Sequence, residues 1–159
     1  MSIEKVRTYF GELGIAHKIR EFEVSSATVE LAAAALGVEG ARIAKSLSFM
    51  LSDGAILVIA AGDAKIDNSK YKHTFGQKAK MLSFDEVEPT IGHAVGGVCP
   101  FAINEGVRVF LDNSLKRFET VFPAAGSASS AIELTIPELE RYSGFVSWVD
   151  VCKTIENID

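Results

Sequence analysis

Residues 45–62 carry the pattern that most restricts how this chain can fold. In "KSLSFMLS" (45–52), leucine and phenylalanine alternate with serine, which is the period of two that a strand with one buried face requires. The next two residues, Asp53-Gly54, are typical of a two-residue hairpin turn, and "AILVIAAG" (55–62) supplies a returning apolar strand. An antiparallel hairpin is therefore predicted near the middle of the chain.

Short helix and strand patterns surround this hairpin. Helices are predicted over residues 2–14, 28–37 and 68–76, and after the capping-box residues Ser83 and Thr135. Further strands are predicted over residues 17–24, 107–111, 119–123, 131–135 and 145–149. Because strands and helices do not alternate strictly, a doubly wound sheet is disfavoured. The pattern predicts an α+β fold with a mixed, barrel-like β-sheet surrounded by short helices.

Length and charge narrow the function classes. A chain of 159 residues has the length of one domain, so residues 1–159 are expected to form a single unit. The net charge of −5 argues against a non-specific nucleic-acid binder, and no binding to DNA is expected. No apolar run is long enough to span a bilayer, and the N-terminus lacks the apolar segment of a signal peptide. A cytoplasmic location with no membrane contact is expected.

Lys45 stands at an unusual position in the hairpin. It has the same parity as the leucine and phenylalanine positions of its strand, so its side chain is expected on the apolar face. Desolvating an ammonium group costs several kcal/mol, and lysine is rarely buried without a partner. Lys45 therefore either extends its ammonium group to solvent or holds it ready for an anion, and the pattern leaves both open.

"AVGGVCPFAI" (94–103) is expected to be a buried apolar strand interrupted by two glycines, a cysteine and a proline. Glycine weakens a strand, so this pair indicates a backbone surface that is open to a ligand. Cys99 with His93 is an alternative nucleophile and base, although no nearby residue supplies a third, orienting group. Cys99 is otherwise a small buried residue.

Two other features are ambiguous on their own. "AAGSASSAIEL" (124–134) is either a plain turn or a source of backbone N–H groups and hydroxyls for an anion or carbonyl oxygen. Residues 63–80 hold five lysines and two aspartates, which makes either a solvated surface or a footprint for a polyanion. The histidines and cysteines have no metal-ligand spacing and no disulfide framework, so neither a metal nor another cofactor is predicted.

Four segments taken in order resemble the YbaK/EbsC family of aminoacyl-tRNA deacylases. They are "ARIAKSLSF", "AGDAKIDNSK", "AVGGVCPFAI" and "AAGSASSAIEL". The resemblance covers almost the whole chain, and its specificity comes from the order and spacing of the four segments. That family is related to the editing (insertion) domain of bacterial prolyl-tRNA synthetases. The resemblance implies a mixed sheet with helices around a small aminoacyl pocket, and it implies neither a metal nor a protein nucleophile.

The resemblance also implies which residues carry the chemistry. Lys45 falls on the active-site lysine and is expected to anchor a terminal phosphate or a ribose hydroxyl. The backbone N–H groups of Gly96, Gly97 and Val98 are expected to hold the ester carbonyl. The expected substrate-binding residues are Phe22, Pro100, Phe101, Gly126, Ser127 and Ala128, although Phe22 and Phe101 suit the core better than the pocket wall. Lys65, Lys70 and Lys72 are expected to contact the tRNA backbone.

The function implied is hydrolysis of a mischarged aminoacyl-tRNA in trans, with tRNA-Pro or a similar tRNA as the carrier. A free ribose hydroxyl would help to activate water. "GSASSAIEL" (126–134) lacks the cationic residues and the aspartate of the branch that removes cysteine. The amino acid is therefore open among alanine, serine, cysteine and a non-protein analogue. A synthetase is a further possible partner. The alternatives are a non-catalytic module that binds tRNA or a synthetase, and a thiol hydrolase that uses Cys99.

Overall fold

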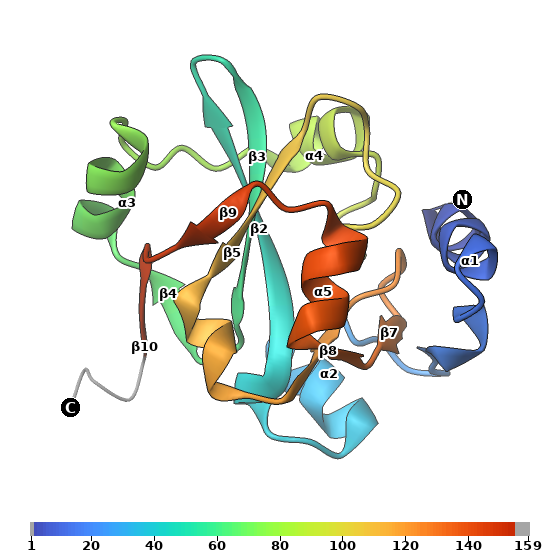
Figure 1. Ribbon diagram of the computed structural model, residues 1–159. Helices are drawn as coiled ribbons and strands as arrows, with labels where there is room; N and C mark the ends of the chain where they lie inside the picture. The colour runs from blue at the N-terminus through green and yellow to red at the C-terminus, as the bar shows by residue number, and fades with distance from the viewer. Residues whose placement is uncertain (1, 155–159) are drawn as a thin grey trace.

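The computed structural model describes residues 2–154, and its centre is the predicted hairpin (Figure 1). Strands β2 (Ile43–Leu51) and β3 (Gly54–Ala61) are antiparallel, and Leu51 pairs with Gly54 across the turn. Gly54 has a φ of 132°, a backbone conformation that favours glycine. The alternating pattern and the Asp-Gly turn therefore predicted this part of the fold correctly.

The hairpin forms the middle of a six-stranded mixed sheet with the order β8-β6-β2-β3-β5-β9. The other strands are β5 (Arg108–Asp112), β6 (Thr120–Pro123), β8 (Leu134–Thr135) and β9 (Ser147–Val149). The pairs β2–β6, β3–β5 and β5–β9 are parallel, whereas β2–β3 and β6–β8 are antiparallel. Strand β3 has neighbours on both sides and buries nearly all its side chains, which explains its unbroken apolar sequence. The sheet curls into a half-barrel, so the predicted α+β class is confirmed.

Two small antiparallel ladders complete the β structure. β1 (Ile19–Glu21) pairs with β7 (Ser130–Ile132), and β4 (Ala64–Ile66) pairs with β10 (Cys152–Thr154). Neither β4 nor β10 is predicted from the sequence, because three residues are too few for an alternation to show.

Within residues 2–154, five short α-helices pack around the sheet (Figure 1). They are α1 (Ser2–Glu12), α2 (Val29–Leu36), α3 (Asn68–Phe75), α4 (Phe84–Ile91) and α5 (Ile136–Ser143). Short 3-10 turns cover Ala16–Lys18, Gly40–Arg42 and Asn113–Arg117. Both predicted capping boxes form, since the Ser83 and Thr135 N–H groups each donate to the glutamate three residues later, at 2.9 Å.

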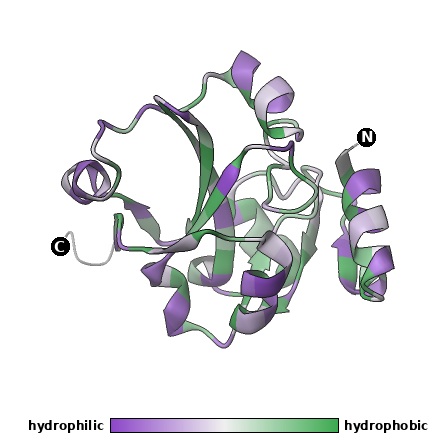
Figure 2. Ribbon diagram, turned by 45° about the horizontal axis from the view of Figure 1, so that its top comes forward, coloured by the Kyte–Doolittle hydropathy of each residue, from purple (hydrophilic) through white to green (hydrophobic). Residues whose placement is uncertain are grey.

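The main core lies between the sheet and its helices, and the strands of the hairpin are apolar along most of their length (Figure 2). Phe10 of α1 packs against Phe101 and Tyr142, with ring centroids 4.8 Å and 5.8 Å apart. A second, smaller cluster joins α2 to the ends of β2 and β6 through Ala32, Ile43 and Phe122. This second cluster fixes the start of α2 beside β2.

The segment 94–103 is not an interrupted strand, so this expectation is wrong. These residues form a loop between α4 and β5 with no strand in it. Gly96 has a φ of 94°, and the Gly97 N–H donates to the Ala94 carbonyl at 3.0 Å, which makes a tight turn. The apolar residues that follow enter the core from this loop without pairing to a neighbouring strand. Their hydrophobicity reflects burial rather than a β-ladder.

Candidate functional site

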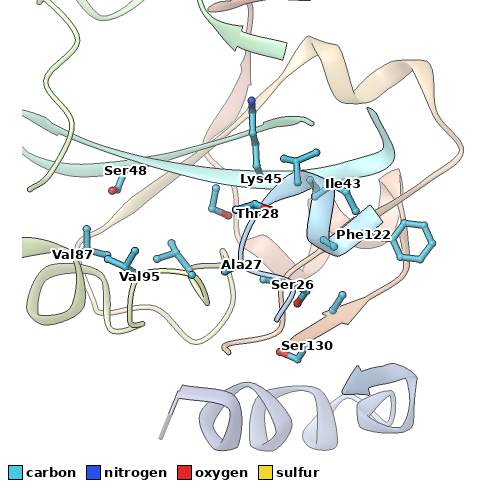
Figure 3. A pocket seen from close by; sticks show the side chains of 18 of the residues that line it. Ser26, Ala27, Thr28, Ile43, Lys45, Ser48, Val87, Val95, Phe122 and Ser130 are labelled. Carbon is cyan, nitrogen blue, oxygen red and sulfur yellow. The ribbon is translucent and has the colours of Figure 1, made fainter. Parts of the chain in front are cut away.

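A cavity of about 400 Å³ opens between the start of α2, strand β2 and helix α4 (Figure 3). Its apolar walls include Val29, Ile43, Val87, Val98 and Phe122, and its polar groups are Ser26, Thr28, Ser46, Ser48 and Ser130. Among the described residues that line it, Lys45 is the one ionisable side chain. Ligand cavities range from about 300 to 1,000 Å³, so this one suits a small group.

The serine side of β2 faces this cavity. Ser48 is buried, and Figure 3 shows its side chain on the same side of β2 as Val87 and Val95. The Ser46 hydroxyl is also buried and has no hydrogen-bond partner among the described residues. Leaving a buried hydroxyl unpaired costs about 1–3 kcal/mol. A polar group of a ligand, or a water molecule, in the cavity can satisfy it.

Lys45 borders the cavity, but its ammonium group points away from the serines. Figure 3 shows it on the opposite side of β2 from Ser48, as the strand alternation predicts for these two positions. No described residue hydrogen-bonds the ammonium group, and Asp63 and Glu30 act on it only as nearby negative charges. Strand β6 pairs with β2 only at Ile43 and Ala44, so it does not cover the edge of β2 beside Lys45.

The surroundings of Lys45 weaken its hold on its proton. Burial lowers the pKa of its ammonium group, and the nearby negative charges of Asp63 and Glu30 offset part of this effect. The Asp63 carboxylate accepts a hydrogen bond from Arg117 Nη1 at 2.9 Å, and the hydrogen-bonded Arg117 lowers the pKa of Asp63. Since Asp63 is already paired, Lys45 remains a half-buried cation without a dedicated counter-ion.

The two glycines of the 94–103 loop have different positions. Gly96 lines the cavity together with Val98, and a Cβ on Gly96 would approach the methyl groups of Ala27 and Ala128 to 3.3 Å. Gly97 is buried beside the cavity, and its N–H is already donated to the Ala94 carbonyl. Of the three amides expected to hold an ester carbonyl, those of Gly96 and Val98 therefore belong to residues at the cavity. Gly97 instead allows two loops to pack closely.

The second small-residue loop supports the cavity from outside. Gly126, Ser127 and Ala128 are expected to bind substrate; they lie next to the 94–103 loop, but they are not among the residues that line the cavity. The Ser26 N–H donates to the Ala128 carbonyl at 2.6 Å, which ties the loop to the segment before α2. The Ser127 hydroxyl donates to the Ser130 hydroxyl at 2.8 Å. The loop thereby fixes Ser26 and Ser130, which do line the cavity.

Three other expected substrate-binding residues lie outside the cavity. Pro100 and Phe101 are buried, and Phe101 is fixed in the core by Phe10. Phe22 is half-buried, and its N–H donates to the Ser129 carbonyl at 2.8 Å. The structure places Phe101 in the core and leaves both aromatic side chains out of the cavity wall.

Cys99 and His93 lie close together but cannot form a nucleophile and base. Both are fully buried, with Cys99 Sγ 3.5 Å from His93 Nε2. His93 Nε2 donates to the Phe101 carbonyl at 2.7 Å, so it has no lone pair for the thiol proton. Burial raises the pKa of the Cys99 thiol to about 12. Cys99 is therefore a structural residue.

The three lysines expected to contact tRNA lie on β4 and α3, and none of them lines the cavity. Lys70 Nζ donates to Asp150 Oδ1 at 3.1 Å and to the Cys152 carbonyl at 3.2 Å. The hydrogen-bonded Asp150 raises the pKa of Lys70. Lys65 and Lys72 are exposed. Contact between these two side chains and tRNA remains a prediction, whereas Lys70 already has a partner.

Neither a metal cluster nor a membrane-spanning helix is present among residues 2–154. No group of three or more His, Cys, Asp or Glu side chains is placed to hold a metal ion. No described helix combines the length and the apolar character needed to cross a bilayer.

Sequence patterns did not reveal the polar wall of the cavity. Ser26, Thr28 and Ser130 come from three separate segments, and their meeting depends on the Ala128 contact and on the small cluster under α2. Ser46 and Ser48 belong to a visible pattern, but alternation alone does not say whether a polar face borders solvent or a cavity. Phe84 also lines the cavity, and the sequence marks it only as the apolar residue that follows the N-cap Ser83 at the start of a helix.

Comparison with known proteins shows the family of the chain. The model of the aminoacyl-tRNA editing domain matches residues 23–142, a range that includes every residue named above as lining the cavity. "Uncharacterized protein YwhH" of Bacillus subtilis (strain 168) is 56% identical over 157 residues, which are 98% of this chain and 100% of that protein. The proline–tRNA ligase of Bacillus cytotoxicus is 26% identical over 88 residues, which are 55% of this chain but 16% of the ligase.

Solved structures show the same fold. A protein provisionally described as a trans-editing enzyme for prolyl-tRNA synthetase superimposes with a TM-score of 0.85 and 29% identity, over 96% of this chain and 97% of its own. Hypothetical protein APE2540 superimposes with a TM-score of 0.83 and 27% identity, over 94% of this chain and 99% of its own. The resemblance to the YbaK-type proteins is confirmed, and the chain belongs to the aminoacyl-tRNA editing domain family.

Proposed function

We propose that this protein hydrolyses the ester bond of a mischarged aminoacyl-tRNA as a separate, trans-acting enzyme. The observation that carries the proposal is the cavity lining, where Lys45 is the one ionisable side chain among the described residues. The lining holds no carboxylate, imidazole or thiol, and the Lys45 ammonium group points away from the serines, so no base stands beside a serine hydroxyl to activate it as a nucleophile. An aminoacyl ester is already activated, so positioning the substrate and stabilising the developing oxyanion are enough.

In the proposed reaction, the aminoacyl group occupies the cavity and the terminal ribose lies at its mouth. The oxygen of a water molecule attacks the ester carbonyl carbon, and the free ribose hydroxyl orients that water. The N–H groups of Gly96 and Val98 stabilise the negative charge on the carbonyl oxygen. The bond between the carbonyl carbon and the ribose oxygen then breaks, and that oxygen takes a proton from the attacking water. The products are deacylated tRNA and the free amino acid, whose carboxyl group releases its own proton.

Lys45 is proposed to hold a terminal phosphate or a ribose hydroxyl of the acceptor end. To do so its side chain must turn from the orientation in Figure 3 toward the mouth of the cavity. It breaks no hydrogen bond when it turns, and the edge of β2 beside it is not covered by β6. A half-buried ammonium group without a partner gains most from an anion, because the attraction is less screened than in water.

The proposed substrates carry a small, uncharged amino acid. Serine hydroxyls and short aliphatic groups line the cavity, and no described acidic residue lines it that could pair with a basic side chain. Alanine, serine, cysteine and a non-protein analogue fit this description, with tRNA-Pro or a similar tRNA as the carrier. Discrimination among them is limited, since one methylene is worth about 1–3 kcal/mol in a pocket.

The direct test is to incubate the purified protein with a panel of tRNAs mischarged with alanine, serine, cysteine or proline, and to measure the loss of the ester bond. Hydrolysis of one or two of these by the purified protein, abolished in Lys45→Ala, would support the proposal and name the amino acid. If the protein binds the tRNAs but leaves every ester intact, it acts as a binding module of the same fold and the proposal is wrong.

A further inference from the structure

Helix α4 carries an apolar stripe that leaves the core at the mouth of the cavity. Phe84, Val87 and Ile91 are spaced to lie on one face of the helix. Ile91 is fully buried and Val87 is 7% exposed, but Phe84 is 76% exposed. The stripe therefore continues past the core with its largest side chain in solvent, where it contributes little to folding.

Two further apolar side chains lie beside Phe84 at the cavity. Met81 is 58% exposed, Val95 is 47% exposed, and both line the cavity together with Phe84. The remaining large, exposed apolar side chains of residues 2–154 do not line it; they are Leu13, Val24, Leu31 and Val146. We call Met81, Phe84 and Val95 the apolar rim.

The backbone beneath the rim is fixed, although the side chains are exposed. The Met50 N–H donates to the Lys80 carbonyl at 2.9 Å, and the Leu82 N–H donates to the Ser48 carbonyl at 3.2 Å. These two bonds hold Met81 along the edge of β2. The capping box fixes the start of α4 and with it the position of Phe84. A rigid apolar surface beside a cavity is typical of a binding site.

We propose that the apolar rim is the platform on which the terminal nucleobase of the tRNA acceptor end stacks. This inference rests on the proposed function, because an aminoacyl group in the cavity is esterified to the terminal ribose and leaves the attached base at the mouth. An aromatic ring and a thioether offer a base the stacking surface that single-stranded nucleic-acid sites use. Stacking accepts any base, so the rim contributes affinity and orientation rather than sequence selectivity.

Charge around the rim favours a base over the phosphate backbone as its occupant. Asp85 and Glu88 are exposed on α4 beside Phe84, and acidic groups repel phosphates. Lys78 and Lys80 are exposed on the segment that leads to Met81. A neutral base on the rim, with the preceding phosphates directed toward the lysines, agrees with both observations.

The test uses an RNA hairpin that carries no amino acid and whose CCA end has 2-aminopurine in place of the terminal adenine. Stacking of this base on Phe84 changes its fluorescence, so the signal reports the rim contact without any deacylation. We expect saturable quenching with the wild-type protein, about tenfold weaker affinity with Phe84→Ala, and near-normal affinity with Phe84→Tyr. Val146→Ala is the control, since Val146 is similarly exposed and does not line the cavity.

Steady-state deacylation of mischarged tRNA separates this proposal from the proposed function. Phe84→Ala is expected to raise KM about tenfold with little change in kcat. If the wild-type protein deacylates and Phe84→Ala has an unchanged KM and unchanged quenching, the proposed base stacking on the rim is wrong, while the proposed deacylase function is supported. If quenching depends on Phe84 but no ester is hydrolysed, base stacking on the rim is supported and the proposed deacylase function is wrong. A synthetase that binds the wild-type protein but not Phe84→Ala, with quenching unaffected, would assign the rim to a protein and overturn the inference.

Discussion

Gly97 and Ser127 are in direct backbone contact: a Cβ on residue 97 would lie 2.8 Å from both the amide nitrogen and the Cα of Ser127. This contact joins the loop after α4 to the loop that supports Ser26 and Ser130. Because the close atoms belong to the backbone, neither loop can yield by rotating a side chain. The shape of the cavity therefore depends on the absence of a side chain at position 97.

Gly97→Ala is expected to lower both stability and deacylation. The added methyl group forces the two loops apart, and overpacking of this kind costs about 1–3 kcal/mol in the free energy of unfolding. Urea denaturation measures the loss, and the mischarged-tRNA assay measures the activity. Gly11→Ala is the matched control, because a Cβ there meets nothing within 4 Å and Gly11 lies in α1. An unchanged stability in Gly97→Ala would contradict the close contact.

Lys45→Ala is expected to abolish deacylation without unfolding the protein. The lost ammonium group is half-buried and has no hydrogen-bond partner among the described residues, so its removal is expected to leave the free energy of unfolding unchanged or slightly raised. Lys45→Arg keeps the charge and is expected to retain part of the activity. Lys153→Ala serves as a control for general loss of positive charge, since Lys153 is exposed on β10 and does not line the cavity. Full activity in Lys45→Ala would remove Lys45 from the mechanism.

Ser46→Ala distinguishes the effect of the Ser46 hydroxyl on stability from its effect on substrate binding. Removing a buried, unpaired hydroxyl relieves an unfavourable term of about 1 kcal/mol, so the variant is expected to be at least as stable as the wild type. If a substrate pairs with this hydroxyl, KM for deacylation rises in the same variant. Thermal unfolding and steady-state kinetics give the two readouts, and a less stable variant would mean that the hydroxyl has a partner in the free protein.

The two thiols are expected to resist alkylation in the folded protein. Burial raises the pKa of both Cys99 and Cys152 to about 12, so almost no thiolate is present near pH 7.5. Mass spectrometry after iodoacetamide treatment is expected to show no label in buffer and two labels in denaturant. Cys99→Ala is expected to keep near wild-type deacylation. Loss of activity in that variant with its fold intact would revive the thiol mechanism.

Stability is expected to fall as the pH drops below about 6.5, the ordinary value of a histidine. Burial lowers the pKa of His93, whose Nδ1 also lacks a partner among the described residues. Below the ordinary pKa the unfolded chain takes up a proton that the folded protein does not, so acid favours unfolding until the lowered pKa is reached. Urea midpoints between pH 7.5 and 5 measure the effect. His93→Gln can keep the bond to Phe101 and is expected to show a shallower pH dependence.

Local patterns predicted the parts of the fold that depend on local chemistry. The period of two and the Asp-Gly turn predicted β2 and β3, and the Ser83 and Thr135 capping boxes predicted two helix starts. The parity of Lys45 predicted which face of β2 it occupies. Each of these signals is complete within about ten residues of the sequence.

The rest of the site depends on contacts between distant segments. The apolar residues of 94–103 resemble a buried strand in the sequence, because a loop that enters the core is as hydrophobic as a strand inside a sheet. The place of Phe101 in the core depends on its contact with Phe10, which lies in the first helix, far away in the sequence. The amide of Gly97 is occupied by a turn within its own loop, which composition alone does not reveal.

The cavity walls contain several of the smallest side chains, among them Ala44, Ala124 and Ala131. At each of these positions, one exchange to serine or valine would reshape the chamber while leaving Lys45 and the glycine loop as they are. Under the proposed function, such exchanges would change which aminoacyl group fits the cavity while the proposed catalytic groups keep their positions.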